Sequence, residues 1–174
     1  MKAFEIRNAD YKVNIAEGLD SILDSIANMA MNSGELAIGT SSKAKVKVVK
    51  DLFFQVDGVM KMIAAATEIA FTATTDDIAA NATTAQERTY ILASNGTTTK
   101  LVGGVQAAQG ASVDPTEAVL EAAVAGYVAL GRVKIAIAAG ATPFDASTDL
   151  LDAAHITDTY ENLGLYAGRF SDIM

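Results

Sequence analysis

Two different spacings of apolar residues divide the chain. Between residues 15 and 30 apolar side chains recur every three or four positions, which is typical of one face of an amphipathic helix. Asn14 with Glu17 has the spacing of a capping box, and Asn32-Ser33-Gly34 suits a helix end. We therefore predict a helix of about four turns. Its apolar stripe is Leu19, Ile22, Leu23, Ile26, Met29 and Ala30.

This helix is too short to be stable alone, so its stripe must pack against something. One partner is the chain's own domain, and the other is a matching helix in a neighbouring subunit. We take the second as the working hypothesis and predict an intersubunit contact. The interface residues are Leu19, Ile22, Leu23, Ile26 and Met29.

From Lys43 onward the spacing changes to two. In the segment KAKVKVVKD (43–51) lysines alternate with apolar residues, which predicts a strand with one polar and one apolar face. The lysine face (Lys43, Lys45 and Lys47) is typical of a solvated face or of an edge strand protected against self-pairing. It could also meet an acidic partner surface.

Two hairpins are predicted by dipeptides that favour tight turns. The first joins LFFQV to VMKMIAAA through Asp57-Gly58, and the second joins RTYILAS to TTTKLVGG through Asn95-Gly96. We expect the second connection to be a type I′ turn, in which both central residues have positive φ.

Other local signals complete the expected fold. Asp114-Pro115 resembles an N-cap followed by proline at the first helical position, and predicts a short helix to Ala123. Strands are expected over Glu68–Ala73 and Tyr127–Ile137, and the tail from Pro143 is read as loop with one or two helical turns. The predicted class is α+β, mainly β. It comprises an N-terminal helical arm (residues 1–42) and a small antiparallel β-sandwich or barrel-like domain (residues 43–174).

Composition narrows the function classes. The net charge of −8 and the pI near 4.5 argue against general nucleic-acid binding, which requires a basic surface. The hydrophobic fraction is 51%, yet aromatic residues make up only 6%, so we expect some apolar surface to be buried between subunits. The absence of cysteine excludes disulfides and thiol catalysis. We also expect no membrane span and no signal peptide, and synthesis in a cytoplasm.

Candidate chemical residues are few. His155 is the single histidine, read as a loop residue, and Asp76-Asp77 are read as solvated loop charges. Asp145, Asp149 and Asp152 could supply oxygen ligands for Ca²⁺, but they lack EF-hand spacing, and Asp149 as a helix N-cap is the simpler interpretation. The glycines of Gly103–Gly110 match no phosphate-binding motif. We therefore predict no catalytic residue, no metal site and no cofactor.

Several segments resemble, in their order, a family of small virion proteins of tailed bacteriophages. These are a strand ending in Asp57-Gly58, the RTYILAS hairpin, the GYVALGRVKI strand and the closing phrase FDASTDLLDAAHITDTY. The resemblance covers about Val49–Leu163 and excludes the N-terminal arm. Where the family has a proline-rich segment this chain has EAAVA (121–125), so a short helix is expected there. The matching residues are Arg88, Tyr90 and Leu92 in the hairpin and Phe144, Thr148, Leu151, Ile156, Thr157, Thr159 and Tyr160 in the closing phrase.

The resemblance implies a non-enzymatic structural protein of the virion. The expected role is that of a head decoration (cement) protein, a homo-oligomer with a trimer favoured, which bridges capsomers and has the major capsid protein as its partner. The alternative is a tail-fibre or host-surface recognition module whose loop Thr72–Thr84 contacts glycans. A small hydrolase is a third class, but it would need a convergent acid pair that the sequence does not show.

Overall fold

A computed structural model of the protein describes residues 27–72 and 75–163, and it is mainly β. Antiparallel strands and one helix account for its regular structure, so the predicted fold class is confirmed. In chain order the elements are β1 (Leu36–Ile38), β2 (Lys45–Val48), β3 (Leu52–Val56), β4 (Val59–Ile63), β5 (Glu68–Ala70), β6 (Gln86–Ser94), β7 (Thr99–Gly103), β8 (Ala107–Ala108), α2 (Glu117–Ala123), β9 (Val128–Ile137) and β10 (Ile156–Glu161).

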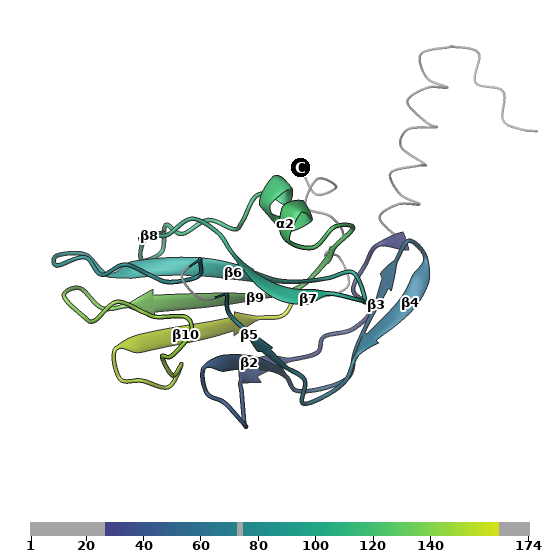
Figure 1. The fold of residues 1–174 in the computed structure, drawn as a ribbon, viewed down its shortest axis with the longest axis horizontal. Helices are drawn as coiled ribbons and strands as arrows, with labels where there is room; N and C mark the ends of the chain where they lie inside the picture. Colours follow the sequence, from purple (N-terminus) through teal and green to yellow (C-terminus); the bar gives the residue numbers. More distant parts are fainter. Residues whose placement is uncertain (1–26, 73–74, 164–174) are drawn as a thin grey trace, which may run out of the picture.

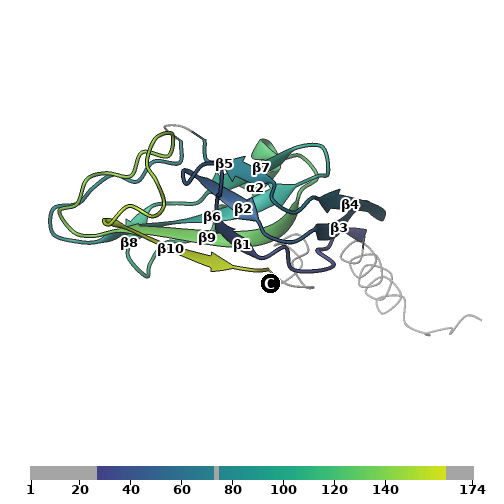
Figure 2. The same ribbon diagram turned by 90° about the horizontal axis from the view of Figure 1, so that it is seen from below.

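The strands form three antiparallel sheets. The largest has the order β10-β9-β6-β7, and β8 adds to the start of β6. The second has the order β1-β2-β5, and the third is the hairpin β3-β4. Figures 1 and 2 show the second sheet lying across one face of the largest sheet, with the hairpin at one end and α2 on the opposite face.

The central strands β6 and β9 are buried on both faces. Tyr90 and Leu92 of β6 face the larger core, which lies between the largest sheet, the β1-β2-β5 sheet and the hairpin. Ile91 and Ala93 point the other way, into a smaller core beneath α2. The period-two pattern of β6 therefore places apolar side chains on both sides of the sheet.

Helix α2 covers one part of this second face. Leu120 is fully buried in the smaller core, together with Val124 and Tyr127, which follow the helix. The N-cap is Thr116 rather than the predicted Asp114, and Pro115 precedes the helix instead of opening it. The carboxylate of Asp114 is engaged by an arginine of β9, and this tertiary contact takes the place of helix capping.

The hairpin β3-β4 has the predicted two-residue turn. Asp57 and Gly58 both have positive φ, at 49° and 74°, as a type I′ connection requires. The partners run from Val56↔Val59 at the turn to Leu52↔Ile63 at the base.

The turn between β6 and β7 differs from the prediction. Residues 95–98 form a four-residue connection, and within it only Gly96 has positive φ. The side chain of Asn95 accepts hydrogen bonds from the N–H groups of Thr97, at 3.0 Å, and Thr98, at 2.8 Å. This local side-chain bonding stabilises a longer turn, so the predicted type I′ turn at Asn95-Gly96 is wrong.

The N-terminal boundary also differs. Ala30 is not helical; it forms a bridge with Phe54 of β3, and Met31 donates a backbone hydrogen bond to Phe53. Strand β1 pairs with β2 in residues 36–38, so the described part of the predicted arm, 27–42, belongs to the β domain. The division predicted at residue 42 does not coincide with a structural one, because β1 and β2 are hydrogen-bonded neighbours.

Two further predictions are corrected by strand pairing. Strand β2 lies between β1 and β5, so the lysine face does not guard a sheet edge. The tail predicted as loop contains β10, which pairs with β9 along its full length. The sequence of β10, ITDTYE, has few apolar residues, so its strand conformation depends on β9 rather than on its own pattern.

A single carboxylate joins β5 to the loop between β1 and β2. Glu68 accepts backbone hydrogen bonds from Thr40 and Ser41, both at 2.6 Å, and from Ser42 at 3.2 Å. The Ser41 hydroxyl donates to the same carboxylate. The Ser41 side chain, followed by these backbone N–H groups, lowers the pKa of Glu68 from 4.5 to about 2 by stabilising its charged form.

Adjacent residues of β9 test the assignment of the two faces. Ile135 is fully buried in the larger core, whereas Lys134 points to the opposite, partly exposed face. Ile135→Ala should lower the free energy of unfolding by about 2–5 kcal/mol, because it leaves a cavity. Lys134→Ala should lower it by no more than about 1 kcal/mol. Urea denaturation measures both, and equal losses would contradict the register.

The Glu68 contacts predict an acid-sensitive link. Because the pKa is lowered in the folded state, the link stabilises the fold above pH 4.5 and is lost as the pH falls through about 2. A carbon-13 NMR titration should find the Glu68 carboxyl titrating near 2. In Ser41→Ala the pKa should rise toward 4.5, and a wild-type value at or above 4.5 would refute the interpretation.

Candidate functional site

Three of the residues that carry the resemblance, Arg88, Tyr90 and Phe144, meet around the loop 75–78. The guanidinium of Arg88 donates to three backbone carbonyls, those of Gly104 at 2.8 Å, Thr75 at 2.6 Å and Asp77 at 3.0 Å. The hydroxyl of Tyr90 donates to the carbonyl of Asp76 at 2.5 Å. Side chains of β6 thus fix the backbone of the loop.

The adjacent carboxylates of this loop are not solvated. Asp76 is only 1% exposed, and its carboxylate accepts the backbone N–H of Thr72 at 2.6 Å. Burial raises the pKa of Asp76, although the Thr72 hydrogen bond and the charge of Arg88 oppose the rise. The carboxylate of Asp77 accepts the backbone N–H of Ala146 at 2.9 Å. The sequence-based interpretation as solvated loop charges is therefore wrong, because both aspartates bind backbone groups.

The closing phrase packs against the same loop. Phe144 forms a backbone bridge with Ile78, with both N–H···O distances at 3.0 Å. The ring of Phe71 makes edge-to-face contacts with Tyr90 and with Phe144, with centroids 5.0 and 5.9 Å apart. Hairpin and closing phrase, separated by about forty residues, thus form one packed unit around residues 75–78.

The three aspartates considered as cation ligands bind backbone groups of their own segment or a lysine side chain. Asp145 accepts from the backbone of Ser147, and Asp149 accepts from the backbone of Asp145, both at 2.8 Å. Asp152 forms an ion pair with Lys43. No helix follows Asp149, so it does not cap one. Within residues 27–72 and 75–163, no group of three or more histidine, cysteine, aspartate or glutamate side chains could hold a metal ion.

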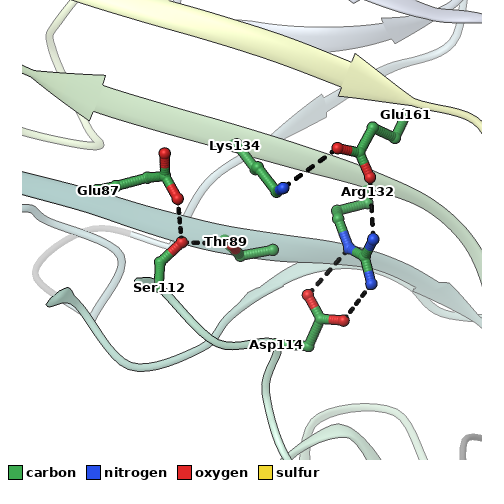
Figure 3. A network of polar contacts seen from close by, with 7 residues as sticks. All are labelled: Glu87, Thr89, Ser112, Asp114, Arg132, Lys134 and Glu161. Atoms are coloured by element: carbon green, nitrogen blue, oxygen red, sulfur yellow. Dashed lines mark hydrogen bonds and ion pairs between the residues drawn. The ribbon is translucent and has the colours of Figure 1, made fainter. Parts of the chain in front are cut away.

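A second polar cluster joins the largest sheet to the loop that precedes α2 (Figure 3). Arg132 of β9 binds the carboxylate of Asp114 through two nitrogens, with the Nε–Oδ1 distance at 2.9 Å. The same guanidinium contacts Glu161 of β10 at 2.9 Å, and Lys134 contacts Glu161 at 3.2 Å. Burial opposes the charge of Arg132, but its bonds to Asp114 and Glu161 raise its pKa overall.

The cluster continues along β6 without forming a catalytic arrangement. Ser112 donates to the carboxylate of Glu87, and its hydroxyl lies 2.8 Å from that of Thr89. A carboxylate is a weak base for a serine hydroxyl, and the Nε2 atom of His155 has no hydrogen-bond partner among the described residues. The arrangement attaches the loop before α2 to the sheet. Figure 3 shows that its members come from β6, β9, β10 and this loop.

A shallow cavity of about 220 Å³ lies between α2 and β7. Val119 and Ala123 line it from the helix, and Lys100 and Val102 line it from the strand. Asp76 reaches the same cavity, but its carboxylate is already bound to the Thr72 backbone.

The most exposed apolar side chains of any described strand lie on the hairpin β3-β4. We define the methionine face as Phe53, Met60 and Met62, whose exposed fractions are 39%, 50% and 53%. Phe53 and Met62 are directly paired across the two strands, and the pattern of β3 and β4 places all three on the side away from the core. An apolar cluster of this kind typically marks a contact surface.

Of the predicted interface residues, Met29 is half-buried, and its carbonyl accepts the backbone N–H of Gln55 at 2.8 Å. Leu19, Ile22, Leu23 and Ile26 lie outside the described residues. The sequence-based search missed the methionine face, although the alternation of VMKMI signals it once that hairpin is assigned.

Comparison with protein-family models, with curated proteins and with solved structures gave no match to this chain. None of the helices among the described residues is long and apolar enough to cross a membrane.

The role of Arg88 as a backbone anchor gives a testable prediction. Arg88→Met should lower the free energy of unfolding by about 2–4 kcal/mol, because it leaves three carbonyls without a donor. Lys100→Met removes the same charge from an exposed position of β7 and should cost less than about 0.5 kcal/mol. Urea denaturation of the two variants is the measurement. A loss in Arg88→Met no larger than in Lys100→Met would show that the anchor does not stabilise the loop.

Proposed function

We propose that the chain is a non-enzymatic structural protein of a tailed-bacteriophage virion, a head decoration protein that bridges capsomers. Its partners would be further copies of itself, with a trimer favoured, and the major capsid protein. It would be made in the bacterial cytoplasm and act in the virion.

The observation that carries this proposal is the methionine face of the hairpin. The hairpin β3-β4 lies at one end of the molecule (Figure 1). An exposed phenylalanine and two exposed methionines on one side of it cost solubility unless another surface covers them. The burial of such side chains between subunits is the means by which a cement protein would stabilise a shell.

The polar clusters support the same interpretation. The charged residues of the motif region bind backbone carbonyls, backbone N–H groups and one another. Arg88, Tyr90 and Phe144, which carry part of the resemblance, therefore act in the architecture of the domain, as a structural protein requires.

Binding to capsids tests the proposal. Purified chain should co-sediment saturably with capsids assembled without it, and should raise the temperature at which they disrupt, because a ligand stabilises the state that it binds. An unrelated acidic protein of similar charge serves as control. Failure to co-sediment would refute the decoration role, and binding instead to host cells or their polysaccharide would favour the host-recognition alternative.

A further inference from the structure

The backbone beside the hairpin fixes where the first part of the chain emerges. Met31 donates to Phe53 O at 2.8 Å, Gln55 donates to Met29 O at 2.8 Å, and Gly58 donates to Ala27 O at 2.9 Å. Residues 27–31 therefore run antiparallel to β3 along its outer edge. Toward the N-terminus this segment ends at Ala27, beside the turn of the hairpin. Residues 1–26 are therefore attached at the tip of the hairpin.

The sequence of the joining segment complements the methionine face in chemistry. It carries the apolar stripe Leu19, Ile22, Leu23 and Ile26. As the predicted helix, residues 19–26 would span about 12 Å. The methionine face runs along β4 from Met60 to Met62, two residue steps of about 7 Å, so it can hold about one turn of such a helix. Methionine side chains adapt to the shape of an apolar partner.

The geometry points to a second copy of this chain as the occupant: we propose that the methionine face of one copy binds the stripe Leu19–Ile26 of another. Residues 27–31 run toward the hairpin tip as they are followed toward the N-terminus, whereas Met60 and Met62 lie behind the tip. To reach its own face the segment would have to reverse direction at Ala27. The face of a neighbouring hairpin requires no reversal.

The arrangement is reciprocal, because every copy carries both the stripe and the face. Two or more copies can exchange segments until all faces are covered, as a closed oligomer requires. This inference deepens the proposed oligomer interface and rests on that part of the proposed function. It does not depend on the capsid.

Cysteine cross-linking of full-length chains tests the contact, because the natural chain has no cysteine. An Ile22→Cys chain is mixed with a Met62→Cys chain, oxidised and digested, and the disulfide-linked peptides are identified by mass spectrometry. A 22–62 link between two singly substituted chains is intermolecular by construction. A mixture of Ile22→Cys with Val113→Cys is the control, because Val113 is an exposed apolar residue away from the hairpin.

We expect the 22–62 link to form at least about tenfold more efficiently than the 22–113 link. Two outcomes would overturn the proposal. One is a 22–62 link that forms only within the single chain of an Ile22→Cys/Met62→Cys double variant, which would make the segment's own hairpin the occupant. The other is a 62–62 link that dominates, which would mean that hairpins pair with each other.

A second measurement tests the same contact without relying on disulfide formation by the cysteine variants. Met60→Lys/Met62→Lys changes two exposed side chains, so circular dichroism should remain unchanged while self-association weakens at least about tenfold by light scattering. The control Val105→Lys/Val113→Lys adds the same charge at exposed sites elsewhere. Equal association of both variants would refute the contact. Because no capsid is present, loss of capsid binding with intact cross-linking would refute only the decoration role.

Discussion

The pairing of β6 with β9 is the interaction on which the rest of the structure depends. Both strands are buried on their two faces, so every layer of the protein packs on this ladder. Its register shifts between Leu92 and Ala93, near Gly131 of β9. A side chain at Gly131 would lie 2.5 Å from Leu36 of β1, so the glycine allows the second sheet to approach closely.

Long loops have to be held against this ladder, and charged residues perform that task. Arg88 binds the backbone of the loop 75–78, and Asp76 and Asp77 of that loop bind backbone N–H groups of neighbouring segments. Arg132 binds Asp114 in the loop before α2. The charges of these two clusters are matched by backbone groups, by an opposite charge or, for Glu87, by the hydroxyl of Ser112, as burial demands. The consequence is that the polar groups of these two clusters serve the fold.

The hairpin β3-β4 contrasts with the rest of that surface. The protein as a whole is strongly acidic, which keeps separate molecules apart in solution. On the methionine face three apolar side chains are exposed together. Association through this face would therefore combine short-range apolar attraction with longer-range repulsion, and added salt should favour it by screening the repulsion.

The sequence by itself determined those strands and turns that depend only on neighbouring residues. The alternation in β2, the length of β9 and the positive-φ turn at Asp57-Gly58 each depend on neighbouring residues, so they could be predicted. The mainly β class followed from them. The methionines of VMKMI were visible too, but their exposure depended on which side of the hairpin faces the core.

Tertiary structure decided what depends on distant partners. Strand β10 exists because β9 offers it an edge, and Ala30 is extended because it pairs with Phe54. Asp76 is buried because a tyrosine and an arginine of β6 bind the backbone of its loop. In each case the deciding hydrogen bonds join residues far apart in the chain, and local propensity carries no information about such partners.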